Sequence, residues 1–153
     1  MLNEDYREIL QSLLKRDVRF LVVGAYAMAA QGYPRSTGDI DIWVEPSQEN
    51  SRKVYGALAK FGAPLKNITQ ETFAQKDLIF QMGVQPRRID IITCIDGVDF
   101  DRAYSNREMI LANGLKIPFL SSKDIIKNKQ ATGREKDRLD VKYLSKMKKK
   151  KSR

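Results

Sequence analysis

Two aspartates one residue apart, at the start of an apolar run, restrict this chain more than any other feature. Asp39 and Asp41 flank Ile40, and the segment from 40 to 44 is otherwise apolar. The run predicts a β-strand, on which alternate side chains share a face, so both carboxylates would lie on one side of a sheet. Two bare carboxylates in that position repel each other and resist ionisation. A hard divalent cation such as Mg²⁺, which prefers oxygen ligands, would relieve the repulsion.

A third carboxylate lies in a similar apolar setting farther along the chain. Asp90 interrupts a strand-like run over residues 88–92, and a neighbouring strand could bring it beside the first pair. Nucleotidyl transfer needs the charge on a phosphate to be neutralised, and two metal ions held by a few carboxylates can do this. The three aspartates are therefore the candidate catalytic and metal-binding residues, with Mg²⁺ as the expected cofactor in a two-metal site. The alternative for Asp90 is a simple ion pair with Arg88 or Arg87.

The residues before the first aspartate form a pattern that suits phosphate groups. An apolar strand over residues 18–23 ends at Gly24, and residues 25–30 favour a helix. Gly24 permits a close approach of the backbone, and the free amides of the following helix attract phosphate. Arg35 and Thr37 could contact a nucleotide, or they could simply shape the turn before the strand.

Apolar periodicity and turn residues predict the other elements. Helices are expected over residues 3–16, from Ser47 to about 61, from about 123 to 132 with Ser122 as its cap, and after Gly133, and strands over 78–82, 88–93, 109–111 and 115–117. Asn113-Gly114 predicts a two-residue hairpin turn, because both positions accept a positive φ. No second domain or long linker is visible.

Two residue counts exclude several kinds of chemistry. The chain has no histidine, which excludes Ser-His-Asp hydrolysis, Cys-His proteolysis and histidine-ligated zinc. Its single cysteine, Cys94, excludes an intrachain disulfide and fits a reducing cytosol. We expect Cys94 to be a small buried hydrophobe. An apolar stretch over residues 20–30 looks like a secretory signal, but acidic residues precede it and it is too short to span a bilayer, so we expect a cytoplasmic protein without membrane contact.

Positive charge is concentrated at the C-terminus. The net charge is +9, and six of these charges come from lysines and one arginine within residues 146–153. The body, over residues 1–145, is therefore only mildly basic. A terminal lysine run is either an exposed helix end or a contact for RNA or DNA phosphates.

The order of these motifs resembles the nucleotidyltransferase superfamily related to DNA polymerase β. The residues that carry the resemblance are Leu21-Val22-Val23-Gly24, Arg35, Thr37, Asp39-Ile40-Asp41 and Ile89-Asp90-Ile91. Members share a glycine at the end of the first strand, a D-x-D on the second and a third carboxylate on a later one. The long spacing from glycine to aspartate looks more like lincosamide and aminoglycoside nucleotidyltransferases and the AbiEii-type toxins than like the short-spaced minimal enzymes.

The C-terminal segment extends the resemblance. Lys129, Ala131, Gly133-Arg134, Lys136-Asp137 and Asp140 look like the helical K-x-A-x-G-R-x-K-D-x-x-D stretch of such bacterial enzymes. By resemblance, Lys129 and Arg134 would face the triphosphate and bind nucleotide with Gly24; the alternative is that they are solvated helix charges. We expect Asp137 and Asp140 to cap the fold or to form surface pairs with nearby basic residues.

The resemblance implies an α/β (α+β) fold, with a mixed sheet flanked by helices over residues 1–145 and a basic tail over 146–153. It implies Mg²⁺-dependent transfer of a nucleoside monophosphate from an NTP such as ATP to a hydroxyl. With no acceptor-binding domain visible, the expected acceptor is RNA, such as a tRNA end, or a protein, in a toxin–antitoxin setting with an antitoxin partner. The alternatives are an antibiotic acceptor and a catalytically silent relative that binds nucleotide or nucleic acid. One departure from the family pattern is Ala25, which stands where the family usually has serine or a second glycine and removes one hydroxyl contact to the phosphates.

Overall fold

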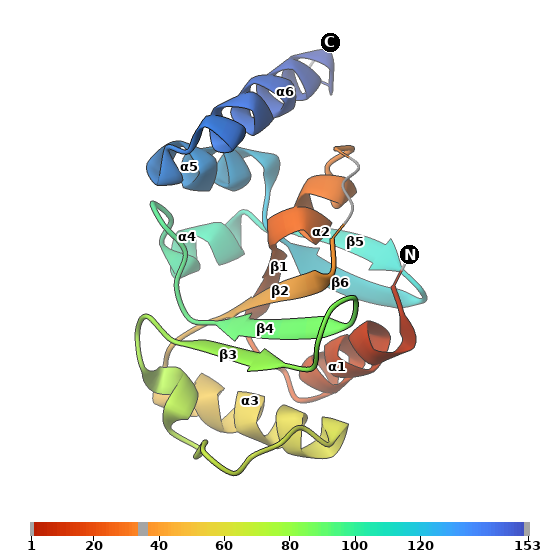
Figure 1. Ribbon diagram of the computed structural model, residues 1–153, viewed down its shortest axis with the longest axis vertical. Helices are drawn as coiled ribbons and strands as arrows, with labels where there is room; N and C mark the ends of the chain where they lie inside the picture. The colour runs from red at the N-terminus through yellow and green to blue at the C-terminus, as the bar shows by residue number, and fades with distance from the viewer. Residues whose placement is uncertain (1, 34–36, 152–153) are drawn as a thin grey trace.

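A mixed β-sheet forms the centre of the computed structural model, which describes residues 2–33 and 37–151 (Figure 1). The strands are β1 (Phe20–Val23), β2 (Asp39–Val44), β3 (Ile79–Met82), β4 (Arg88–Ile92), β5 (Glu108–Ala112) and β6 (Leu115–Phe119). Their order across the sheet is β3-β4-β2-β1-β6-β5. β2 runs parallel to β4 and antiparallel to β1, and β6 is parallel to β1. The expected mixed sheet flanked by helices is confirmed.

The helices lie on both sides of this sheet (Figure 1). α1 (Glu4–Lys15) and α3 (Gln48–Phe61) lie side by side on one side, and a short 3-10 turn, η1 (Thr72–Ala74), packs against α3. The other side carries α2 (Gly24–Ala30), α4 (Phe100–Ser105), α5 (Ser122–Thr132) and α6 (Glu135–Lys151). α6 packs on α5, and the basic end of the chain continues α6 as far as Lys151. In the described residues, none of the helices combines the length and the apolar content that crossing a membrane requires.

Alternation along β2 decides which face of the sheet becomes core. Ile40 and Ile42 are fully buried, whereas Asp39 and Asp41 lie on the opposite face and are partly exposed. Each buried isoleucine contributes about 1.5–3 kcal/mol to folding. Trp43 follows on the aspartate face, where the ring of Phe100 meets it edge-on at a centroid distance of 5.0 Å. The tryptophan is therefore core, and the two aspartates are the residues of this face that remain open.

Local signals set the ends of most elements, with one shift. The Asn3 side chain caps α1, and Asn113 and Gly114 form the hairpin turn with φ values of 50° and 79°. The cap of α5 is Ser121, not the predicted Ser122: the Ser121 hydroxyl accepts a hydrogen bond from the amide of Asp124 at 3.2 Å. Because the two serines are adjacent, only the position of the preceding strand decides which of them caps the helix.

The segment after β4 differs most from expectation. α4 was not predicted, because six residues are too few to establish a helical period; Asp99 caps it by accepting from the amide of Arg102. The expectation that Cys94 is buried is wrong: it is exposed, and its thiol donates to Asp77 Oδ1 at 3.1 Å. β4 ends two residues earlier, so Cys94 lies in a loop beyond the core.

Candidate active site

The pairing of β2 with β4 brings the three predicted carboxylates together. In the parallel register Asp41 lies opposite Asp90, and Asp39 lies opposite Arg88. All four side chains therefore leave the sheet on the same face. Carboxylate oxygens from the three aspartates lie within 4.8 Å of one another, close enough for one cation to contact all three. These residues could therefore hold a hard metal ion such as Mg²⁺.

Arg88 binds two of the three carboxylates. Its Nη2 lies 2.6 Å from Asp39 Oδ2 and 3.3 Å from Asp90 Oδ2, and its Nε lies 3.1 Å from Asp90 Oδ1. The ion pair that the sequence offered as an alternative for Asp90 is thus formed as well as the cluster. The two arrangements are compatible because the planar guanidinium forks between neighbouring strands.

Thr37 acts on the cluster through Asp39. Its hydroxyl donates to Asp39 Oδ1 at 2.7 Å and lies near the Asp39 backbone. This contact orients the carboxylate and leaves its second oxygen to Arg88. Thr37 also lines the cavity beside the cluster. Arg35, the other residue predicted from this turn to contact nucleotide, falls outside the described residues.

Gly24 makes room for Asp41. The glycine has φ +69°, and a β-carbon at this position would overlap the Asp41 carboxylate. A side chain here would also be strained, because L-residues disfavour positive φ. The sequence predicted that Gly24 lets a phosphate approach the backbone; the structure adds that the glycine lets a carboxylate lie against the start of α2.

The middle carboxylate has an unusual protonation equilibrium. Burial, the negative charges of Asp39 and Asp90 and a hydrogen bond with Asp90 together raise the pKa of Asp41 to about 7, against the opposing effect of Arg88. Without a metal ion, Asp41 therefore carries a proton over much of the range below neutral pH. A divalent cation that binds the cluster would have to displace this proton, which couples metal binding to pH.

Tyr6 supports the cluster from the first helix and could not be identified from the sequence as part of the site. Its hydroxyl donates to the carbonyl oxygens of Arg88 at 3.0 Å and Pro86 at 3.2 Å. Burial, with contributions from Tyr26 and Asp39, raises the pKa of Tyr6 to about 12, so the hydroxyl remains a donor. Tyr6 therefore fixes the entry into β4, from which Arg88 and then Asp90 project.

A cavity of about 350 Å³ opens beside the carboxylates. Its walls come from the start of α2, from β2, from the loop after β4 and from the junction of α5 and α6. The lining residues are Val23, Gly24, Ala25, Thr37, Asp39, Asp41, Ile92, Ile95, Asn128, Lys129, Arg134 and Lys136. The structure thus brings Lys129 and Arg134 to the same cavity as the aspartates, and adds Lys136 and Asn128. Cations opposite a metal-binding cluster are suited to polyphosphate.

Lys129 is held in place by two buried acids. Its ammonium lies 3.3 Å from Asp137 Oδ1 and 3.2 Å from Asp140 Oδ2. The expected pairing of Asp137 with Arg134 is formed, but the expectation that these acids lie at the helix surface is wrong, since Asp137 is 0% and Asp140 2% exposed. Gly133 turns the chain with φ +66°, so the first turns of α6 pack on the end of α5 and bury both acids.

Asp137 remains ionised despite its burial. Burial acts to raise the pKa of Asp137, but hydrogen bonds from Arg134, Thr132 and Lys129 outweigh it and hold the pKa well below its usual range. Arg134 Nε donates to Asp137 Oδ2 at 2.8 Å, while much of the Arg134 side chain is exposed. The cluster therefore presents an ordered lysine and a more open arginine to the cavity.

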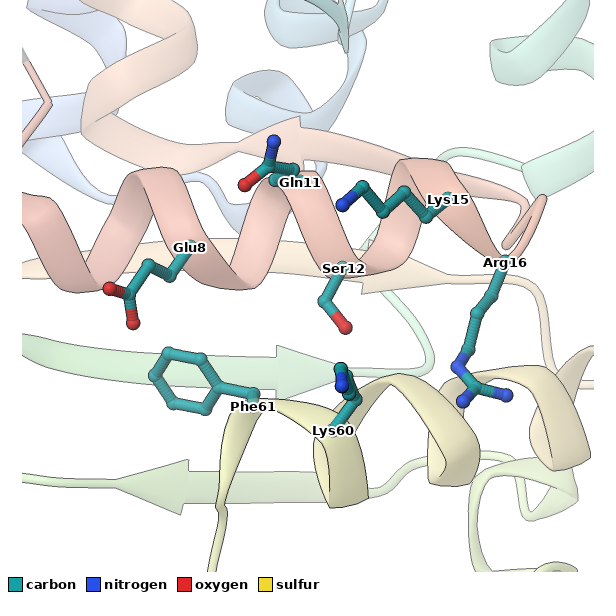
Figure 2. A pocket seen from close by; sticks show the side chains of 7 residues that line it. All are labelled: Glu8, Gln11, Ser12, Lys15, Arg16, Lys60 and Phe61. Carbon is teal, nitrogen blue, oxygen red and sulfur yellow. The ribbon is translucent and has the colours of Figure 1, made fainter.

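A larger cavity, of about 700 Å³, lies between α1 and α3 (Figure 2). Figure 2 shows Ser12 on the first helix and Arg16 at its end directed towards the other helix, which carries Lys60. The remaining lining residues are Glu8, Gln11, Lys15 and Phe61. One carboxylate among these residues provides no metal-binding cluster, so size alone does not identify the functional site.

Comparison with known proteins supports the fold. No protein-family model and no curated protein matches this chain. Among solved structures, a candidate nucleotidyltransferase from Thermotoga maritima matches 99% of this chain and 94% of its own, with a TM-score of 0.56 and 20% sequence identity. At this identity the likeness shows a common fold over nearly the full length of both chains. The narrower resemblance to AbiEii-type and lincosamide enzymes stays a prediction.

Proposed function

We propose that this protein is a Mg²⁺-dependent nucleotidyltransferase that moves a nucleoside monophosphate from an NTP to a hydroxyl group and releases pyrophosphate. The observation that carries the proposal is the cluster of Asp39, Asp41 and Asp90, two of which, Asp39 and Asp41, line a cavity that Lys129, Arg134 and Lys136 also line. The fold shared with the Thermotoga maritima protein supports the same class of activity. Bound Mg²⁺ would neutralise phosphate charge and favour deprotonation of the attacking hydroxyl.

The residues of the site divide between metal and nucleotide. The three aspartates would ligate the metal ions in a two-metal site, and Thr37 would keep Asp39 oriented. Lys129 and Arg134 would bind the triphosphate, because both line the cavity as cations. Ala25, at the start of α2, would offer its backbone in place of the hydroxyl that serine would supply.

We propose a macromolecular acceptor, and the charge around the cavity favours RNA over protein. Lys136 lines the cavity, and α6 continues from it through the exposed residues Arg138, Lys142 and Lys146 towards the basic end of the chain. The two buried acids of this helix are already paired with Lys129. A strand of RNA could therefore follow α6 while its terminal hydroxyl enters the site.

The transfer reaction can be tested with each α-³²P-labelled NTP, Mg²⁺ and a mixture of RNA and cell protein. We expect label in RNA with wild type, none with Asp41→Asn, and normal labelling with Asp101→Asn, which removes an exposed carboxylate that pairs with Arg19. If only protein is labelled, the acceptor is a protein and the proposal of an RNA acceptor is contradicted. Label only in an added aminoglycoside or lincosamide would support the antibiotic alternative and contradict the macromolecular acceptor.

One observation favours the catalytically silent alternative. Arg88 already binds Asp39 and Asp90, as a structural ion pair in a non-catalytic relative would. That alternative predicts that NTP raises the melting temperature while no acceptor is labelled. The toxin–antitoxin setting is a further part of the proposal: growth arrest on expression, relieved by an antitoxin partner and by Asp41→Asn, would support it.

A further inference from the structure

Arg88 occupies oxygen atoms that a metal ion would need. Its guanidinium contacts one oxygen of Asp39 and both oxygens of Asp90, at 2.6 to 3.3 Å. The remaining Asp39 oxygen accepts from Thr37. Two of the three candidate ligands therefore have their hydrogen-bonding capacity engaged by the protein itself.

The pairing of β4 with β2 fixes the backbone of Arg88 beside the cluster. Its backbone pairs with β2 opposite Asp39, and its carbonyl accepts from the hydroxyl of Tyr6. The side chain is 28% exposed, so it has room to turn towards solvent only if it gives up its carboxylates. Among the described residues, Arg88 is the basic side chain that forms ion pairs with Asp39 and Asp90.

We propose that Arg88 is a built-in competitor of the metal ion, which lowers the metal affinity of the nucleotide-free protein by holding Asp39 and Asp90. This inference rests on the proposed function, because it takes the aspartates as metal ligands. A divalent cation and a guanidinium that approach the same oxygens repel each other, and each must share or yield its contacts. Arg88 would then offset one carboxylate charge of the cluster until metal replaces it.

A purely supporting role for Arg88 predicts the opposite effect. If the guanidinium served to orient Asp39 and Asp90 for metal, its removal would loosen both ligands and weaken binding. If it competes, removal strengthens binding. The sign of the change in metal affinity thus separates the two roles, and a general loss of stability cannot imitate tighter binding.

The test is a titration of the full-length protein with Mn²⁺, in which the EPR signal of free Mn²⁺ gives the dissociation constant without NTP. We expect Arg88→Gln to bind Mn²⁺ about tenfold more tightly than wild type. Arg88→Lys keeps the charge but loses the forked contact, so we expect a smaller gain in Mn²⁺ affinity. This second variant keeps the test possible if Arg88→Gln does not fold. Arg87→Gln is the matched control, since Arg87 pairs with Asp5 outside the cluster.

Equal or weaker binding by both Arg88 variants would overturn the inference while leaving the nucleotidyltransferase proposal intact. A gain of the same size in Arg87→Gln would also overturn it, because the effect would then come from net charge and not from contact. Failure of the proposed function gives a different pattern. Wild type would then bind no Mn²⁺, or would bind it no more tightly than Asp41→Asn does, which removes the premise of the inference as well.

Discussion

Asp41 lies directly opposite Asp90 across the parallel strands β2 and β4. Like charges in such a cross-strand pair destabilise a sheet unless something compensates them. Here a proton on Asp41 and the guanidinium of Arg88 provide that compensation without metal. The predictions that follow test the consequences of this arrangement and of the basic wall that faces it.

Replacing Gly24 with alanine should damage both the fold and the cluster. The positive φ alone costs about 1–2 kcal/mol for an alanine, and the new β-carbon would also displace the Asp41 carboxylate. Gly62→Ala is a matched control, because Gly62 has φ +94° but nothing within 4 Å of the added carbon. Urea denaturation should show a larger loss for Gly24→Ala, together with weaker Mn²⁺ binding. Equal losses and unchanged binding would show that Asp41 does not need this space.

Stability of the metal-free protein should fall as the pH rises towards and through neutrality. The folded pKa of Asp41 is about 7, well above the ordinary aspartate value of 3.8, so the folded state holds this proton more tightly than the unfolded state. The resulting stabilisation is complete below about pH 4 and is lost as the pH rises through about 7. Urea denaturation at pH 5 and pH 8 should show a larger fall for wild type than for Asp41→Asn. Identical falls would mean that Asp41 titrates normally.

Removing the Asp137 carboxylate should strongly destabilise the protein. Asp137 is fully buried and accepts hydrogen bonds from Lys129, Thr132 and Arg134. Asp137→Ala leaves the partly buried Lys129 with one fewer counter-charge, and loss of one member of a buried ion pair costs about 3–5 kcal/mol. Glu135→Gln, at an exposed position in the same helix, should change the free energy of unfolding by less than about 0.5 kcal/mol. A small loss for Asp137→Ala would mean that α5 and α6 are held together by other contacts.

Arg134 should contribute to nucleotide affinity more than to stability. Its side chain is 65% exposed but lines the cavity, so Arg134→Gln removes a phosphate-binding charge with little loss of packing. We expect the dissociation constant for NTP, measured by isothermal titration calorimetry, to rise about threefold to tenfold. Arg138→Gln removes another exposed charge from α6, outside the lining of the cavity, and should leave the dissociation constant unchanged. Similar effects from both variants would leave Arg134 as a solvated helix charge.

Deletion of residues 146–153 should weaken RNA binding and reduce its dependence on salt. The segment carries six positive charges, and each phosphate contact that is lost lowers the slope of log affinity against log salt by about 0.7–0.9. Fluorescence anisotropy with a labelled RNA at several salt concentrations measures the slope. Equal slopes before and after deletion would mean that this end of the chain does not touch RNA.

Sequence patterns were most informative where a local rule decides the structure. The strand that carries Asp39 and Asp41 and the hairpin at Asn113-Gly114 follow from side-chain alternation and turn chemistry, and both are present. The proximity of Asp41 and Asp90 needed more, because strand order is a tertiary property. Resemblance to a known fold supplied that step, and the register of β2 with β4 then brought the two carboxylates together.

The features that the sequence did not reveal depend on contacts between distant elements. Asp137 and Asp140 look like ordinary helix-surface acids until α6 packs on α5 and buries them around Lys129. The role of Tyr6 depends on contacts with residues about eighty positions away. Arg88 can contact both Asp39 and Asp90 only in one register of β2 with β4, and no local pattern specifies that register.

The most direct test of the central claim is pyrophosphate release from NTP in the presence of RNA and Mg²⁺, compared between wild type and Asp41→Asn. The account predicts release by wild type that stops when EDTA removes the metal, and none from the variant. The variant should retain its fold, because the amide replaces a carboxyl group that is protonated in the metal-free protein at low pH. Release that persists at the wild-type rate in folded Asp41→Asn, or that is absent from wild type with every NTP, would contradict catalysis by this site.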